Sequence, residues 1–351
     1  MRTVCVHASV TYHILIEKGS LSQSGPYAAQ VFRPGSKAAI VTDDTVASLY
    51  LETVKRSFES AGFTVPVFIF PHGEDSKSRE VLFQLYDFLI EQEVTRSDFI
   101  VALGGGVVGD LAGFAAATYL RGIPFMQIPT TFLAAVDSSV GGKTAINIPA
   151  GKNLIGAFHQ PSLVVCDTET FRTLPPETFA DGVAETIKYG LIASKSLFEE
   201  MEQGHIEEKI DDIVAQCVSI KRDIVEQDEQ DKGLRMILNY GHTLGHAIEK
   251  VTNHSVTHGH GVAMGMLLIA RLGEKMGFHS PELTQRMERC IASYGLPTHY
   301  NGSVSELGES VLHDKKRSGS VIRLIVVKNI GEAEICPLDV DKFIEQLSEV
   351  Q

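Results

Sequence analysis

The sequence predicts an α/β domain with a mostly parallel sheet over residues 1–170, followed by a mainly α-helical domain over residues 171–351. Three observations predict this organisation. The length of 351 residues suggests two domains, at roughly 100–200 residues per domain. Strand-like and helix-like patterns alternate in the first half, which favours a parallel sheet. Helical patterns dominate after the expected boundary at 167–176.

Short apolar runs mark the expected strands of the first domain, at 37–42, 63–70, 99–103 and 125–128. Pro66 places the second of these runs at a sheet edge or a bulge, because proline cannot donate to the ladder. Helical spacing of apolar residues predicts intervening helices at 44–61, 78–93 and 109–119. The second domain has expected helices and one short late strand (323–327), the helices being 177–193, 197–203, 206–228, 234–251, 261–276 and 280–294.

The composition is that of a globular chain, with 44% hydrophobic residues and a formal net charge of −13. A nucleic-acid binder normally carries a basic face, so this charge argues against that class. The five cysteines are widely spaced without a CxxC motif, which favours a reducing compartment. The first residues lack a signal-peptide pattern, and no run approaches the ~18 apolar residues of a membrane span. We therefore expect a cytoplasmic protein with no nucleic-acid or membrane partner.

A glycine-rich turn follows the expected strand at 99–103. Residues 104–109 satisfy GxGxxG, and such a strand-to-helix turn lets backbone N–H groups approach a pyrophosphate. The turn does not follow the first strand, however, and no acidic residue lies about 20 residues later. A tight turn that needs glycine is therefore an equal alternative. If a dinucleotide binds to this Rossmann-like domain, Asp43 at the end of an earlier strand is the better ribose candidate.

Histidines cluster in the second domain. Five of the 13 lie within residues 242–260, and imidazole is a frequent metal ligand near neutral pH. His242 and His246 are four residues apart, so they project from one helix face. A catalytic zinc takes about three protein ligands and keeps one position open. Glu185, which shares a helix face with Lys188, is the best carboxylate candidate, but spacing alone does not select the histidines.

The polar segment 137–147 and residues 151–153 follow a buried strand and combine glycines with Lys143, Lys152 and Asn153. Ligands bind at strand ends in α/β folds, so this loop suits an anionic substrate. It lacks the GxxxxGK[ST] spacing of a P-loop. A solvated surface loop is the alternative.

At segments 104–147, 151–161, 179–190, 233–249 and 257–266 the sequence closely resembles the 3-dehydroquinate synthases of the shikimate pathway, within the sugar-phosphate cyclases. The resemblance implies a dehydroquinate synthase-like homodimer and a carbon–oxygen lyase that acts on phosphate. Its substrate would be 3-deoxy-D-arabino-heptulosonate 7-phosphate, its products 3-dehydroquinate and phosphate. The steps would be NAD-mediated oxidation, phosphate elimination, reduction, ring opening and internal aldol closure. This is the second step of chorismate and aromatic amino acid biosynthesis.

The resemblance also implies roles for individual residues. The ligands of Zn²⁺ or Co²⁺ would be Glu185, His242 and His258, and His246 would transfer protons. The NAD⁺ site would comprise Asp43, Glu74, Lys77, Gly105, Gly106, Asp110, Thr130, Thr131, Lys143, Lys152 and Thr173. The substrate site would comprise Asp137, Lys143, Asn153, Lys188, Lys221, Arg235 and Asn239, of which Lys143, Lys188, Arg235 and Asn239 are also expected to be catalytic.

Three further expectations come from the resemblance. Arg121 would reach the substrate phosphate of the neighbouring protomer, and a lysine of the pair Lys315 and Lys316 would join the site. His260 stands where many members carry a carboxylate, so we expect it to tune the metal site or to have no effect, and not to be a ligand.

Three alternative functions remain at this level: another sugar-phosphate cyclase such as 2-deoxy-scyllo-inosose synthase, a metal-dependent alcohol or glycerol dehydrogenase, and a catalytically silent nucleotide-binding module. The dehydroquinate-type pattern at 137–147 argues against the first. The number of anion-binding residues argues against the second, and the intact metal residues argue against the third.

Overall fold

The computed structural model describes residues 1–253, 255–315 and 321–350. The chain divides into two compact units: the first holds Met1–Leu174 and Val214–Gln230, the second Pro175–Ile213 and Asp231–Gln351. This differs from the expected division at residue 170, because the chain returns to the first unit after entering the second. The returning segment is fixed there by Lys221, whose Nζ lies 2.7 Å from Oδ1 of Asp137.

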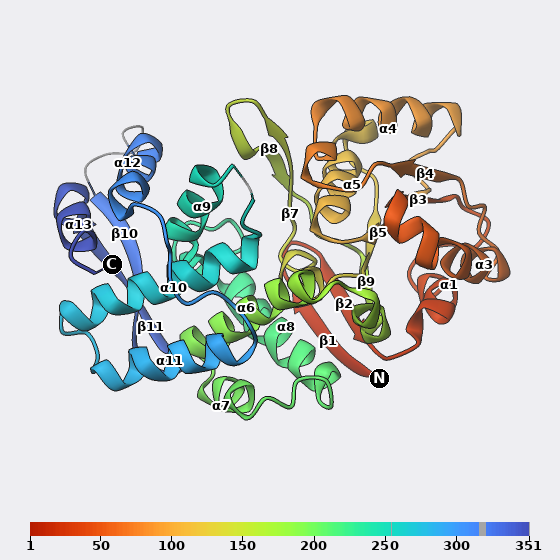
Figure 1. Cartoon of the computed structure of the whole chain (residues 1–351). Coiled ribbons are helices and arrows are strands. Elements are labelled where there is room, and N and C mark those ends of the chain that lie inside the picture. Colours follow the sequence, from red (N-terminus) through yellow and green to blue (C-terminus); the bar gives the residue numbers. More distant parts are fainter. Residues whose placement is uncertain (254, 316–320, 351) are drawn as a thin grey trace. The chain divides into compact units, whose positions relative to one another are not determined.

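The first unit is built on a seven-stranded sheet with the order β1-β2-β9-β6-β5-β3-β4. All neighbouring strands are parallel except β1 and β2, which form an antiparallel pair (Figure 1). The strands are β1 Arg2–His7, β2 Thr11–Ile16, β3 Ala38–Asp43, β4 Val67–Phe70, β5 Phe99–Gly104, β6 Phe125–Pro129 and β9 Leu163–Cys166. The expected α/β fold with a mostly parallel sheet is confirmed, and β4 is the edge strand that Pro66 predicted.

Both faces of the sheet are buried because consecutive residues of the central strands point to opposite sides. Ala39 and Val41 of β3 pack with α4 (Arg79–Glu91) and α5 (Gly106–Thr118). Ala38 and Ile40 pack with α1 (Ser24–Ala28) and α3 (Glu52–Ser60) on the other face. The expected helix at 44–61 is interrupted, since a π-helical turn at Ala47–Leu51 separates α2 (Asp44–Val46) from α3.

The strand order creates a switch point between β3 and β5. From β3 the chain continues to β4 on one side, and then crosses to β5 on the other side. In open parallel sheets, ligands bind in the crevice at the carboxyl ends of the strands that flank such a point. Asp43 ends β3 and Gly104 ends β5, so both lie at this position.

We predicted a loop for the polar segment 137–153, and this prediction is wrong in one respect, because most of the segment forms an antiparallel hairpin. β7 (Lys143–Ile148) pairs with β8 (Gly151–Phe158). Gly113 of α5 explains part of its anchoring, because a Cβ there would lie 2.5 Å from Cγ2 of Thr144. The missing side chain lets β7 lie directly on α5.

The second unit is mainly helical, with one hairpin of β10 (Val321–Asn329) and β11 (Glu332–Asp339). Its helices in the described residues are α6 Pro176–Ala193, α7 Lys195–Gln203, α9 His242–Val251, α10 His258–Lys275, α11 Pro281–Ser293, α12 Val304–Lys315 and α13 Val340–Leu347, with α8 (Ile210–Gln227) running from this unit into the first. The expected single helix at 234–251 is wrong: a 3₁₀ turn at Leu234–Asn239 is separated from α9 by Gly241, whose φ is 79°. In the described part of the chain, no helix has the length and apolar character that crossing a membrane requires.

Candidate active site

The glycine-rich turn lies at the carboxyl end of β5 and opens α5. Gly105 precedes the first residue of α5, so the N–H groups of the first helical turn face the sheet edge. A Cβ on Gly105 would lie 3.0 Å from Cγ2 of Thr131, which follows the neighbouring strand β6. The turn therefore matches the dinucleotide interpretation of GxGxxG, with backbone N–H groups and a helix N-terminus available to a pyrophosphate.

Asp43 stands across the switch point from this turn. One of its carboxylate oxygens accepts a hydrogen bond from the N–H of Val46 at 2.8 Å, which fixes the side chain at the start of α2. Burial raises the pKa of Asp43, and this hydrogen bond offsets part of the effect. A carboxylate held at the end of a strand beside the glycine turn is the group that binds ribose hydroxyls in dinucleotide sites.

A buried cluster joins several of the expected cofactor and substrate residues. Lys77, which is 4% exposed, forms an ion pair with Asp110 of α5, and its Nζ also donates to Oδ1 of Asn153. Burial raises the pKa of Asp110, and the charge of Lys77 counteracts this. Glu74 accepts from Nδ2 of Asn147 at 2.7 Å.

Asn147 is the residue of this cluster that the sequence did not indicate. Its backbone N–H donates to the carbonyl of Lys77 at 2.8 Å, and its Oδ1 accepts from the N–H of Asn153 at 2.9 Å. Together with the bond to Glu74, these contacts fix the turn of the β7–β8 hairpin against three expected site residues. An asparagine at the end of a strand carries no spacing signal that could have selected it.

The remaining expected residues of the first unit lie in different settings. Lys221 is 6% exposed and donates from Nζ to the backbone carbonyl of Asp137 at 2.6 Å as well as to its carboxylate. Thr173 contacts the hydroxyl of Tyr50 at 2.5 Å. Arg121 is exposed on a turn after α5. The other expected residues of this unit are Lys143 and Lys152, both exposed on the hairpin, and Thr130, buried after β6.

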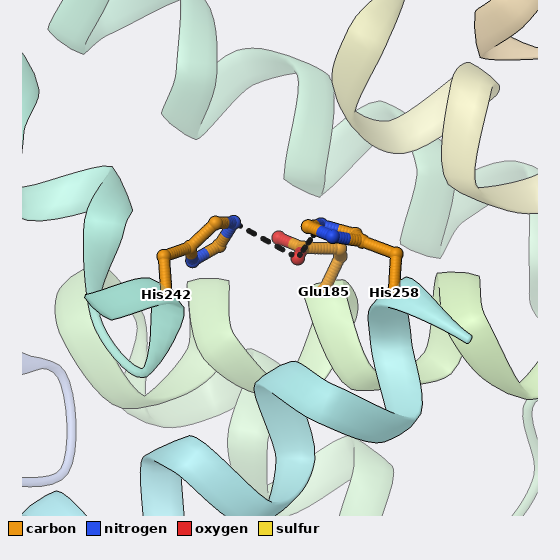
Figure 2. Close-up of side chains that lie close together, drawn as sticks. All are labelled: Glu185, His242 and His258. Atoms are coloured by element: carbon orange, nitrogen blue, oxygen red, sulfur yellow. Dashed lines mark ion pairs between the residues drawn. The ribbon is translucent and has the colours of Figure 1, made fainter. Parts of the chain in front are cut away.

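The second unit brings Glu185, His242 and His258 together (Figure 2). Glu185 lies within α6 and is fully buried, while the two histidines are the first residues of α9 and α10. Nε2 of each histidine lies 3.4 Å from Oε1 of Glu185. One potential ligand atom from each residue lies within 4.8 Å of the others, so a single ion can reach all three.

Glycines explain how two helices bring their first residues so close. A Cβ on Gly265 of α10 would lie 2.2 Å from the carbonyl oxygen of Gly241, just before α9. On the opposing side, a Cβ on Gly245 would lie 3.0 Å from the backbone nitrogen of Val262. The backbones of α9 and α10 are therefore in direct contact, and this contact places His242 beside His258.

The outer nitrogen of each histidine has its own partner. Nδ1 of His258 donates to Oε1 of Glu249 at 2.9 Å, and Nδ1 of His242 donates to the carbonyl of Tyr240 at 3.2 Å. With Nδ1 bound to these partners, each Nε2 faces Glu185. Carboxylate and carbonyl partners of this kind orient histidine ligands in metal sites and increase their basicity.

The electrostatics of the cluster also favour a cation. Burial lowers the pKa of His242 to about 3, with the charge of Lys188 acting in the same direction. Burial alone would lower the pKa of His258, but Glu185 and Glu249 outweigh it and raise the pKa to about 10. The two buried carboxylates thus stabilise positive charge on the His258 ring, Glu185 at Nε2 and Glu249 at Nδ1. Two imidazoles and one carboxylate fit a divalent ion with an open coordination position.

Lys188, one turn after Glu185, is also buried and forms an ion pair with Oε2 of that carboxylate. Arg235, 2% exposed, and the exposed Asn239 lie in the 3₁₀ turn that leads to Gly241. The expected lysine of the pair Lys315 and Lys316 has its side chain outside the described residues.

His246 lies one turn after His242 and is exposed, with its ring centroid 5.4 Å from that of His242 and 5.8 Å from that of His258. His246, Glu249 and His258 form a second group with ligand-like spacing. Because Glu249 already binds Nδ1 of His258, and Glu185 lies between both Nε2 atoms, the first trio is the better metal site.

His260 lies on the first turn of α10 with Nδ1 directed to other groups. It is 2.7 Å from Oγ1 of Thr257 and 3.3 Å from Oδ1 of Asp181. These contacts place it beside the expected metal trio and not within it.

Family models for the N-terminal and C-terminal parts of 3-dehydroquinate synthase match residues 67–181 and 182–317. The chain belongs to the 3-dehydroquinate synthase family. The 3-dehydroquinate synthase of Streptococcus suis (strain 05ZYH33) is 46% identical over 343 residues, which is 96% of each chain.

Two solved structures of related synthases have the same fold over their full length. A 2-deoxy-scyllo-inosose synthase complexed with carbaglucose-6-phosphate, NAD⁺ and Co²⁺ superposes with a TM-score of 0.90 at 25% identity, covering 100% of both chains. The 2-epi-5-epi-valiolone synthase from Streptomyces hygroscopicus subsp. jinggangensis 5008, with NAD⁺ and Zn²⁺ bound, has a TM-score of 0.87 at 23% identity, also covering 100% of both. Membership of the 3-dehydroquinate synthase family, with high identity over nearly the whole chain, distinguishes this protein from the dehydrogenase and non-enzymatic alternatives.

Proposed function

We propose that this chain is a 3-dehydroquinate synthase, a carbon–oxygen lyase that converts 3-deoxy-D-arabino-heptulosonate 7-phosphate to 3-dehydroquinate and phosphate. The observation that carries the proposal is the trio of Glu185, His242 and His258, whose carboxylate is fully buried, in a chain that is 46% identical to a 3-dehydroquinate synthase. A sheet-edge dinucleotide site accompanies this trio. A reaction that oxidises and later reduces the same substrate needs the dinucleotide to accept and return a hydride, and the ion would polarise the reacting oxygens.

NAD⁺ and a divalent ion, Zn²⁺ or Co²⁺, are the proposed cofactors. When bound, NAD⁺ supplies a hydride acceptor, and the ion supplies a Lewis acid for hydroxyl and carbonyl oxygens. Glu185, His242 and His258 hold the ion. The related synthases that contain NAD⁺ with Co²⁺ or Zn²⁺ support this assignment.

In the first unit, the residues at the switch point bind the dinucleotide. Asp43 accepts hydrogen bonds from ribose hydroxyls, and the N–H groups after Gly105 donate to the pyrophosphate. Lys77 and Asp110 hold the adjoining surface through their buried ion pair. The other residues proposed for this site are Glu74, Gly106, Thr130, Thr131, Lys143, Lys152 and Thr173.

The substrate carries a carboxylate and a phosphate, so a chain with a net charge of −13 needs local cations to bind it. Lys188, Lys221 and Arg235 are at most 6% exposed, and buried cations favour anionic partners more strongly than solvated ones do. Lys143, Asp137, Asn153 and Asn239 complete the proposed substrate site. In a homodimer, Arg121 would serve the substrate phosphate of the neighbouring protomer.

His246 is the proposed proton-transfer residue. It is exposed, lies beside the metal trio and is a histidine, whose ordinary pKa suits proton transfer near neutral pH. Lys143, Lys188, Arg235 and Asn239 are proposed to contact the reacting substrate. We expect the protein to act in the cytoplasm.

One assay tests the function. The enzyme receives the heptulosonate phosphate with zinc and a catalytic amount of NAD⁺, and phosphate release, NADH and product identity are followed. We expect phosphate release, 3-dehydroquinate and no net NADH. Net NADH would indicate a dehydrogenase. Phosphate release from glucose 6-phosphate, with none from the heptulosonate phosphate, would indicate another cyclase.

A further inference from the structure

Asp181 joins the helix that carries Glu185 to the segment that carries His258. Both acidic residues lie on α6, four positions apart, so they share a helix face one turn from each other. Glu185 is part of the proposed metal trio, whereas the carboxylate of Asp181, which is 14% exposed, binds Thr257, Gly259 and His260. Its partners are the neighbours of His258.

The contacts of Asp181 surround His258 in the sequence. Oδ1 of Asp181 accepts from Oγ1 of Thr257 at 2.6 Å and from the backbone N–H of Gly259 at 2.8 Å. Nδ1 of His260 lies 3.3 Å from the same oxygen. The residues on both sides of the expected ligand are thus bound to one carboxylate. The bond from Gly259 satisfies an N–H group in the first turn of α10.

Gly259 makes this arrangement possible. A Cβ at this position would lie 2.3 Å from Cα of Asp181, a contact that only a backbone shift could relieve. The start of α10 therefore lies directly on the backbone of α6. Glu185 lies one turn after Asp181 on α6, and His258 immediately precedes Gly259 on α10. The distance between Glu185 and His258 therefore depends on this contact.

We propose that Asp181 is a positioning residue for the metal site, which holds His258 at ligand distance from Glu185 by binding Thr257 and Gly259 across the α6–α10 contact. The inference rests on the proposed metal trio. Asp181 acts through the backbone of the ligand, in contrast to Glu249, which binds the His258 ring itself. Partners that orient metal ligands typically change metal affinity by about 10–100-fold when they are removed.

The test measures metal affinity of the full-length chain, loaded with Zn²⁺ or Co²⁺ and titrated with a competing chelator. We expect Asp181→Ala to weaken the affinity about 10–100-fold. The metal affinity of Asp181→Asn should lie between those of Asp181→Ala and the parent, because the amide oxygen still accepts hydrogen bonds but the charge is lost. Thr257→Val should weaken the metal affinity, whereas Thr257→Ser, which keeps the hydroxyl, should retain the affinity of the parent. The absorption spectrum of bound Co²⁺ should change in Asp181→Ala, since it reports ligand geometry.

Asp167→Ala is the matched control. Asp167 is 3% exposed and accepts from the N–H groups of Gly19 and Leu21 at 2.8 and 2.9 Å. Like Asp181, it is a carboxylate that binds backbone N–H groups of a distant segment, but it lies in the first unit. It should lower the melting temperature and leave metal affinity unchanged. An equal loss of metal affinity in this control would contradict a local role for Asp181.

Two results would overturn the proposal. One is unchanged metal affinity in folded Asp181→Ala; if that variant does not fold, unchanged affinity in both Asp181→Asn and Thr257→Val decides the matter in the same way. Glu185→Ala separates this outcome from failure of the trio itself. If Glu185→Ala loses the metal and the Asp181 variants keep it, only the positioning role fails. If Glu185→Ala retains the metal, the proposed metal site fails.

Discussion

The direct contact between α9 and α10 predicts that Gly265→Ala will disrupt the metal site from a distance. The new Cβ would lie 2.2 Å from the carbonyl oxygen of Gly241, whereas an ordinary contact begins at 3.4 Å. Because the obstacle is backbone, the two helices must separate. Overpacking of this kind costs ~1–3 kcal/mol, and the helix propensity gained by replacing glycine offsets about 1 kcal/mol.

A net loss of up to about 2 kcal/mol corresponds to a fall in melting temperature of up to ~8 °C for a unit of this size. The apoprotein's melting temperature should be measured by calorimetry, and the metal affinity by chelator competition. We expect both to fall, because separation of the helices moves His242 away from His258.

Gly273→Ala, also on α10, is the matched control. Its Cβ would meet a side chain, that of His279 at 2.9 Å, and not the backbone of α9, and the position lies far along the helix from His258. This variant should keep its metal affinity. If Gly265→Ala matched the parent in both melting temperature and metal affinity, the helix contact would not determine the spacing of the ligands.

Four further predictions concern single side chains. Glu185→Ala and His242→Ala should each lose activity together with tight metal binding, and full activity without bound metal in either would refute the ligand assignment. His260→Ala should retain one metal per chain by elemental analysis, because its Nδ1 is directed toward Thr257; stoichiometric loss would contradict this. Asn147→Ala should raise the dissociation constant for NAD⁺ several-fold by calorimetry, since it loses two hydrogen bonds to expected site residues, and unchanged NAD⁺ affinity would count against a positioning role. Burial lowers the pKa of His159, so below pH ~6.5 the unfolded chain takes up a proton that the folded chain does not. Between pH 7.5 and 5.5, the melting temperature of His159→Asn should therefore fall less than that of the parent. An equal fall would exclude a contribution of His159 to the pH dependence of stability.

The sequence could indicate a candidate dinucleotide site because its signals are local. A strand that ends in Asp43 and a strand that ends in a glycine turn are both visible in a few residues, and parallel strands bring such ends to one edge. The β7–β8 hairpin was missed because its residues read as a polar loop. Its order depends on contacts such as that of Thr144 with Gly113, which no short pattern contains.

The boundary between the two units could not be predicted from short sequence patterns either. α8 is a continuous helix that passes from the second unit into the first between Ile213 and Val214. Periodicity describes one helix and carries no information about which core each of its parts joins. The ion pair of Lys221 with Asp137 decides this, and the two residues are 84 positions apart.

The proposed metal site depends both on a local sequence pattern and on contacts between distant segments. The five clustered histidines indicated a metal, but the spacing did not select His242 and His258 or assign a carboxylate. The structure supplies the missing step through small residues: glycines at 241, 245, 259 and 265 let α9 and α10, and α10 and α6, touch along their backbones. These helix contacts then determine where Glu185, His242 and His258 lie. A glycine in such a position therefore helps to set the geometry of the proposed metal site, and its loss should be visible in metal affinity.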